Sequence, residues 1–313
     1  MRAREPDRAG YVERGGVRVY YECFGTEGDA IVFGPSDVLV NGGMWKAQVP
    51  YLARRHRVVV IDPRGNGRSD KPTDPAAYSD LEMVADLIAV MDEVDVDRAV
   101  LVGLCMSSYY MLCAAARHSE RVDGVVAIAS WAAEGTPRPD RGADYERAIT
   151  SWDSPYDGGD GWSLYNREVW LADWRRWPEF WFSRMVNDPR SSKVREDLVD
   201  WACQSTGPAQ AAAEQAPLIA LTPEATAALL ADVRCPVLAV HGTHDACQIF
   251  TRGAHIARMT GGELLAIGGA GHVPVGRDPV AVNHAIEDFV RRVADGSVSQ
   301  WTDPPAVVRA HLS

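Results

Sequence analysis

A cysteine stands where a predicted strand turns directly into a predicted helix. The aliphatic run 99–102 leads through Gly103-Leu104-Cys105-Met106-Ser107 into a helical segment. Such a tight turn strains its central residue and tolerates only small residues two positions before and after it, a demand that Gly103 and Ser107 meet. The Cys105 thiol would lie at a helix N-terminus, where the dipole favours a thiolate or a developing oxyanion. The alternative is a small buried hydrophobic side chain, the commonest role of a free cysteine.

Two later segments contain the groups that would activate this thiol. A predicted strand at 237–240 runs into a Gly-x-x-Asp loop that ends at Asp245, and a predicted strand at 263–267 runs into a glycine-rich loop that ends at His272. His272 can act as a general base, while Asp245 holds the imidazole in the right tautomer and stabilises the imidazolium. The alternative to this catalytic role is that Asp245 only helps to form the turn. We expect His244 to be a loop residue and His241 to be a packing residue.

These segments, in this order, resemble the α/β-hydrolase superfamily. Cys105 takes the serine position of the G-x-S-x-G nucleophile elbow, and residues 62–69 resemble the family's D-x-R-G-x-G-x-S loop. The resemblance covers about residues 15–130 and 231–292, and is strongest to a bacterial branch described as ester hydrolases. It implies a triad of Cys105, Asp245 and His272, in the chain order of this fold. We interpret the 62–69 loop as structural, with Arg64 pairing with Asp62 or Asp70.

The resemblance also implies an oxyanion hole made of the backbone N–H groups of Met106 and Asp37. Pro35 and Ser36 occupy the positions where the family has a His-Gly pair. A carboxylate beside an oxyanion opposes the chemistry unless it points away, binds a substrate cation or takes part in proton transfer. We expect Asp37 to turn outward and cap a turn.

The pattern of elements predicts the architecture that would position these residues. Continuous aliphatic strands alternate with helical segments, which indicates a parallel sheet covered on both faces. We predict an α/β-hydrolase fold with a mostly parallel eight-stranded sheet, a core of residues 1–130 and 231–295, a helical cap of residues 131–230 and an extension of residues 296–313. Eight of the ten tryptophans lie in the predicted cap. We expect the substrate pocket to include Ser36, Trp131, Trp177 and Trp181.

The composition of the chain limits the kinds of molecule that it can bind. The net charge of −11 argues against nucleic acid, because phosphates need a basic surface. No run is apolar enough for a membrane helix and the N-terminus lacks a signal-peptide pattern, so we expect a cytoplasmic protein that does not bind membranes. The six scattered cysteines favour thiols over disulfides or a zinc site, and we predict neither a metal nor a cofactor. The sequence does not indicate an oligomeric state.

Three functions remain open at this point. The first is hydrolysis of a carboxylic ester, thioester or lactone through an acyl-Cys105 intermediate. The second is acyl transfer or cyclisation by the same triad in a biosynthetic pathway. The third is a ligand-binding protein without catalysis. For the first two we expect a small acyl substrate, with coenzyme A or a carrier protein as candidate attachments. Epoxide or haloalkane opening through an alkyl-enzyme requires an aspartate nucleophile, which position 105 excludes.

Overall fold

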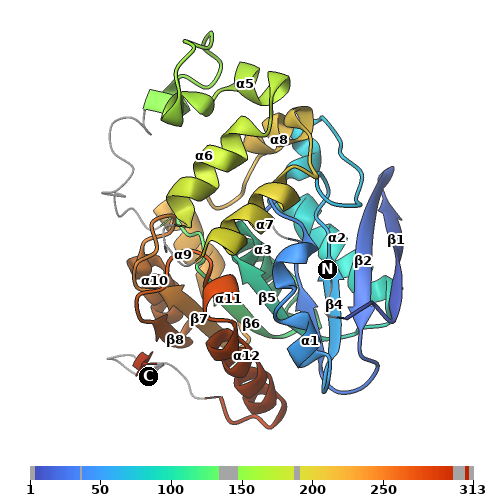
Figure 1. The fold of residues 1–313 in the computed structure, drawn as a ribbon. Coiled ribbons are helices and arrows are strands. Elements are labelled where there is room, and N and C mark those ends of the chain that lie inside the picture. Colours follow the sequence, from blue (N-terminus) through green and yellow to red (C-terminus); the bar gives the residue numbers. More distant parts are fainter. Residues whose placement is uncertain (1–3, 36, 134–146, 187–190, 299–306, 310–313) are drawn as a thin grey trace.

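A single nine-stranded sheet runs through the computed structural model (Figure 1). The structure describes residues 4–35, 37–133, 147–186, 191–298 and 307–309. The strand order is β1-β2-β4-β3-β5-β6-β7-β8-β9. Strand β2 (Val17–Phe24) is antiparallel to β1 (Arg8–Arg14) and to β4 (Arg57–Ile61), whereas the pairs from β4 to β9 are all parallel. The predicted fold class is confirmed, and β9 (Val307–Arg309), within the predicted extension, adds a ninth strand.

The central strands supply hydrophobic side chains to both faces of the sheet. They are β3 (Ala30–Phe33), β5 (Ala99–Leu104), β6 (Val122–Ile128), β7 (Val237–Gly242) and β8 (Glu263–Ile267). Successive side chains of a strand point to opposite faces, so Leu101 packs in one core cluster and Val102 in the other. This burial on both sides explains why the sequences of these strands are nearly continuous aliphatic runs.

Helices cover both faces of the sheet. On one side lie α1 (Val49–Leu52) and α12 (Pro279–Ala294), and on the other α2 (Asp80–Glu93), α3 (Met106–Arg117) and α10 (Phe250–Thr260). The short helix α11 (Pro274–Arg277) precedes α12. In the part of the chain that the structure describes, no helix has the length and apolar character needed to cross a membrane.

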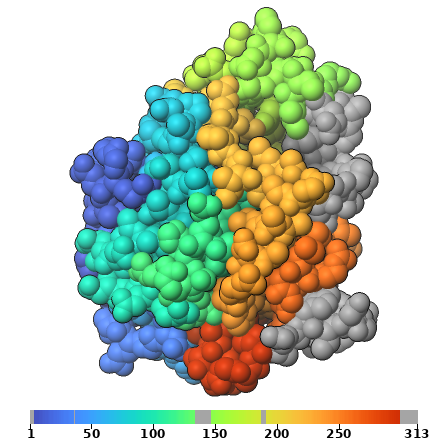
Figure 2. Space-filling view, turned by 180° about the vertical axis from the view of Figure 1, so that it is seen from behind, coloured from blue at the N-terminus to red at the C-terminus, as the bar shows by residue number. Residues whose placement is uncertain are grey.

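The segment between β6 and β7 is helical wherever the structure describes regular elements in it. It contains α5 (Arg167–Ala172), α6 (Arg176–Met185), α7 (Ser192–Ala202), α8 (Gly207–Glu214) and α9 (Pro223–Ala231). Helices α5 and α6 lie above the carboxyl ends of the strands, whereas α9 contacts α3 and α10 of the core. In Figure 2 the residues of α8 and α9 run down the back of the molecule from the cap toward the core.

The loop after β4 is held in a different way from the one expected. The buried Arg64 guanidinium makes two hydrogen bonds of 2.6 Å with the Asp86 carboxylate on α2. Asp62 instead accepts hydrogen bonds from the backbone of Gly42 and Arg68, and Asp70 pairs with Arg18. The structural role of Arg64 agrees with the interpretation, but the partner is wrong because α2, distant in sequence, packs beside this loop.

Candidate active site

Cys105 occupies a strained turn between β5 and α3. Its backbone has φ +58° and ψ −120°, a conformation that costs energy for any residue with a Cβ. The turn is held by its surroundings: the Cys105 N–H donates to the Ile128 carbonyl at 2.9 Å, and its carbonyl accepts from the Trp131 N–H at 3.3 Å. A Cβ at Gly103 would lie 2.5 Å from the backbone nitrogen of Ser108. Only glycine fits at that position while β5 enters the helix.

Asp245 and His272 meet at the carboxyl ends of β7 and β8. His272 Nδ1 lies 2.9 Å from Asp245 Oδ2, and both side chains are buried. The other carboxylate oxygen, Oδ1, accepts the backbone N–H groups of Cys247 at 2.7 Å and Gln248 at 2.8 Å. The acid is therefore held from both sides, as a residue that orients an imidazole must be.

His241 also contacts the acid. Its Nε2 lies 3.2 Å from Asp245 Oδ2 and 2.8 Å from the Gln248 carbonyl oxygen. Because both partners are acceptors, Nε2 carries the proton and donates to them. His241 is buried, as a packing residue would be, but sequence reasoning missed its contact with the acid. His244, the competing histidine, is exposed.

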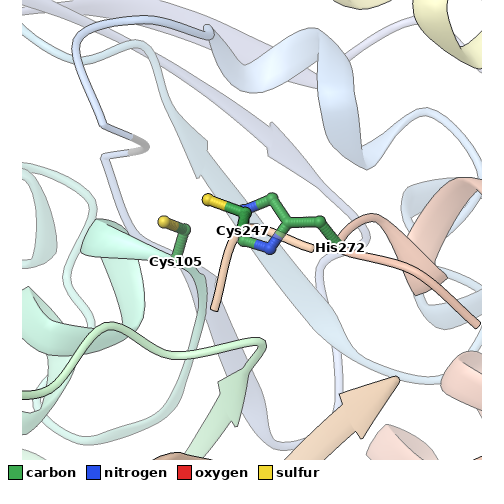
Figure 3. A group of neighbouring side chains, drawn as sticks. All are labelled: Cys105, Cys247 and His272. Atoms are coloured by element: carbon green, nitrogen blue, oxygen red, sulfur yellow. The ribbon is translucent and has the colours of Figure 1, made fainter. Parts of the chain in front are cut away.

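Cys247 is the main residue that the sequence analysis left without a role. One ring nitrogen of His272 and the sulfurs of Cys105 and Cys247 all lie within 4.8 Å of one another (Figure 3). Cys247 forms hydrogen bonds with both Cys105 and His272. Its position two residues after Asp245 was the only signal for it in the sequence. All six cysteines lie in described segments, and none of them forms a disulfide.

The charges of this cluster depend on one another. The hydrogen bond with Cys247, burial and the charge of Cys247 raise the pKa of the Cys105 thiol well above its ordinary value. Burial lowers the pKa of His272, but the Asp245 carboxylate and Cys247 raise it more strongly, to about 10. Burial raises the pKa of Asp245, but the His272 charge and the His241 hydrogen bond outweigh it and keep that pKa well below its usual range. The protonation states of Cys105 and His272 therefore depend on Asp245 and Cys247.

The expected oxyanion donors lie on two elements that border the same cavity. Met106 is the first residue of α3, so its N–H has no partner within the helix. Met106 and Asp37 both line the cavity that contains Cys105. Ser36 lies outside the described residues.

Asp37 does not turn away from this cavity. Its carboxylate accepts backbone hydrogen bonds from Val38 and Leu39, so it caps a turn as expected, but it also lines the cavity. Burial and the neighbouring Cys247 raise the pKa of Asp37 to about 6. The expected outward orientation is wrong, because Asp37 lines the same cavity as Cys105 and burial is the main cause of its raised pKa.

The cavity above Cys105 has a volume of about 230 Å³ and a mainly aromatic wall. The three tryptophans expected here, Trp131, Trp177 and Trp181, all line it. The wall also contains aromatic side chains that the sequence analysis did not select, namely Tyr165, Trp170 and Trp174. Trp177 and Trp181 stack with ring centroids 5.4 Å apart. The wall also includes the polar side chains of Asp37, Gln210, Glu214 and Gln248. A cavity that combines aromatic walls with a few polar groups is typical of a small-molecule site.

The chain belongs to the α/β-hydrolase fold family, whose model matches residues 33–276. Among curated relatives it is 32% identical over 191 residues to epoxide hydrolase B of Mycobacterium tuberculosis, a match that covers 57% of this chain and 49% of that protein. The match thus spans about half the length of that relative. The chain is 23% identical over 288 residues to 3-oxoadipate enol-lactonase 2 of Acinetobacter baylyi, covering 88% and 94% of the two chains.

Solved structures share the whole fold. One of the most similar is Est816, described as an N-acyl homoserine lactone degrading enzyme. It has a TM-score of 0.69 and 28% sequence identity, and the match covers 90% of this chain and 100% of the other. These relatives are hydrolases with differing substrates, so the family defines the class of protein and the site must define the reaction.

Proposed function

We propose that this protein hydrolyses a small carboxylic ester, thioester or lactone through an acyl-enzyme on Cys105. The observation that carries the proposal is the strained turn at Cys105, a residue that lines the aromatic cavity and whose thiol lies within 4.8 Å of a His272 ring nitrogen. The names of the enol-lactonase and of Est816 support a lactone or ester as the substrate class.

Acylation uses the Cys105 thiol and the His272 imidazole. Cys105 passes its proton to the ring nitrogen of His272 that faces it, and its sulfur attacks the carbonyl carbon of the substrate. The N–H groups of Met106 and Asp37 stabilise the oxyanion that forms. Collapse of this intermediate breaks the bond to the leaving alkoxide or thiolate, which takes a proton from His272.

Deacylation returns the site to its starting state. The neutral His272 deprotonates a water molecule, which attacks the thioester carbonyl. Collapse of the second intermediate releases the carboxylic acid and the Cys105 thiolate. That thiolate takes a proton from His272, so the Cys105 thiol and the neutral imidazole are both restored.

Epoxide opening is not the reaction that this site favours, despite the name of one relative. An epoxide opened by covalent catalysis gives an alkyl-enzyme ester on a carboxylate, which water can hydrolyse at the acyl carbon. A cysteine at position 105 would give a thioether instead, which water does not cleave under these conditions. The residue at the elbow therefore favours carbonyl substrates.

Acyl transfer is the second candidate. The cavity wall contains six aromatic side chains that can contact an acceptor, and a thioester reacts readily with amines and thiols. Product analysis with and without such an acceptor separates transfer from hydrolysis.

The experiment is intact-protein mass spectrometry after brief incubation with an activated acyl ester, followed by peptide mapping and steady-state assays. We expect one acyl group on Cys105 in the wild type. In Cys105→Ala we expect no adduct at this site and a turnover lower by at least about 10³-fold. Cys105→Ser is the matched control, because it keeps a nucleophile of similar size in the elbow. An adduct on Cys247 instead, or unimpaired turnover in Cys105→Ala, contradicts the proposal.

A further inference from the structure

Two thiols and an imidazole from three separate segments lie close together, and both thiols line the aromatic cavity. Cys105 comes from the β5–α3 turn, Cys247 from the loop after β7, and His272 from the loop after β8 (Figure 3). The proposed reaction requires only one nucleophilic thiol, and a second cysteine is not needed for a triad. We propose that Cys105, Cys247 and His272 form a binding site for a single zinc ion, with a fourth position open to the cavity.

The types of ligand favour zinc. Thiolate and imidazole ligands together select zinc among the common divalent ions, because magnesium and calcium prefer oxygen. A set of two cysteines and one histidine with an open fourth position is one of the arrangements found for zinc. On a tetrahedral ion with bonds of about 2.3 Å to sulfur and 2.0 Å to nitrogen, ligand atoms lie about 3.5–3.8 Å apart. The three atoms here lie within 4.8 Å of one another, so shifts of about 1 Å or less bring them to that geometry.

His272 is already oriented as a zinc ligand. Its Nδ1 lies 2.9 Å from Asp245 Oδ2, which leaves the other ring nitrogen to face the two sulfurs. A carboxylate that accepts the N–H of a ligating imidazole is the usual neighbour of histidine at zinc sites, since it sets the tautomer and strengthens the ligand. Asp245 is itself held by two backbone N–H groups and by His241.

Gln248 supplies a second, independent indication. Its Nε2 lies 3.6 Å from Cys105 Sγ and 3.7 Å from Cys247 Sγ, so the side-chain amide donates toward both sulfurs. The Gln248 Oε1 accepts from the Arg252 guanidinium, which keeps the amide nitrogen pointing at the sulfurs. Hydrogen bonds of this kind stabilise negative charge on sulfur, and zinc binds the thiolate form.

The ion can reach the site, and it would block the nucleophile. Cys105 and Cys247 both line the cavity, and Asp37 adds a carboxylate to the same wall. One part of this inference rests on the proposed function. If Cys105 is the nucleophile, bound zinc occupies both the attacking sulfur and the base, His272. We therefore expect zinc to inhibit acyl-ester turnover and a chelator to restore it.

The test uses the full chain without an affinity tag, reduced and freed of metal. Zinc is titrated in competition with a chromogenic chelator, and Co²⁺ is added separately to read thiolate coordination from its charge-transfer absorption. We expect one ion per chain with sulfur-to-cobalt bands in the wild type. Cys105→Ala and Cys247→Ala should each weaken the bands and bind zinc at least about 100-fold more weakly, and Asp245→Asn about 10–100-fold more weakly. Cys235→Ser is the matched control, because this thiol lies just before the amino end of β7, whereas the proposed ligands lie at the carboxyl ends of the strands.

A measurement on the wild type covers the case in which a variant does not fold. Zinc should protect Cys105 and Cys247 from alkylation, as mapped by mass spectrometry, while the alkylation of Cys235 stays unchanged. Cobalt spectra without thiolate bands, or equal zinc affinity in the wild type and in Cys247→Ala, overturn the inference. These readouts need no substrate. Zinc binding without Cys105-dependent turnover would reject the proposed function alone, and the reverse result would reject the zinc site alone.

Discussion

At the scale of single residues, the site places several acidic groups close together. Asp245, Asp37 and two thiols surround one imidazole, and Cys247 contacts both Cys105 and His272. The Asp245 charge is stabilised by donors on both oxygens, whereas burial in the cavity disfavours the Asp37 charge. Ionised Asp245 therefore stabilises the folded protein, whereas ionised Asp37 destabilises it. The effect of Asp37 can be measured with a substitution.

Asp37→Asn should stabilise the protein at high pH only. The folded-state pKa of about 6 lies above the ordinary 3.8, so the folded state prefers the protonated acid. Wild-type stability should therefore fall as the pH rises from about 4 to 6 and then level off. Above pH 7 we expect the substitution to raise the free energy of unfolding by about 1–2 kcal/mol, since an asparagine side chain can accept the same turn hydrogen bonds without the charge. Thermal melts from pH 4 to 8 measure this, and an equal difference at both ends of the range contradicts it.

At the scale of elements, each group of the candidate site lies where a parallel strand ends. Cys105 follows β5, Asp245 follows β7, His272 follows β8, and Asp37 follows β3. The strands are neighbours or next neighbours in the sheet, so their carboxyl ends gather these four loops at one edge. The turn after β5 is the most constrained of them, because it combines positive φ with close packing of the strand against the helix.

Gly103→Ala tests this packing. The added methyl group would lie 2.5–2.7 Å from the backbone of Ser107 and Ser108, so the turn must shift. We expect a loss of about 1–3 kcal/mol in the free energy of unfolding, together with a loss of turnover because the thiol moves. Gly268→Ala is the control, since no atom lies within 4 Å of the Cβ that it adds. Chemical denaturation and the acyl-ester assay measure both effects, and a Gly103→Ala protein as stable and active as Gly268→Ala would contradict the packing argument.

At the scale of the whole molecule, buried polar contacts join segments that are distant in the sequence. Asp86 on α2 accepts hydrogen bonds from Arg64, in the loop after β4, and from Arg14, at the end of β1. One carboxylate therefore connects the edge hairpin, a covering helix and the loop beneath the site. The Arg64 and Asp86 side chains are 2% and 1% exposed, so neither has water as an alternative partner.

Arg64→Met should destabilise the protein strongly, because it leaves the Asp86 charge buried and without its closest ionic partner. We expect a loss of about 3–5 kcal/mol in the free energy of unfolding. The double variant Arg64→Met with Asp86→Leu should be less destabilised than the sum of the two single variants, since neither charge of the pair is then left buried alone. A denaturation cycle of the four proteins measures the coupling, and strict additivity would show that the pair does not act as a unit.

Local patterns predicted most of the fold and the main elements of the candidate site. The burial of the central strands on both faces, and the small residues around Cys105, are consequences of close packing, which leaves a clear signal in short stretches of sequence. Contacts between distant segments leave no such signal. The partner of Arg64, the contact of His241 with Asp245 and the inward position of Asp37 were therefore mispredicted or missed.

Local sequence patterns are enough to predict the class of fold and the chain order of the candidate residues Cys105, Asp245 and His272. The approach of a second cysteine to this group follows from the folded structure alone. Cys105 and Cys247 are separated in the chain by the whole cap, and no spacing rule relates them. They meet because β5 and β7 flank β6 in one parallel sheet, which brings the loops at their carboxyl ends together over the same cavity.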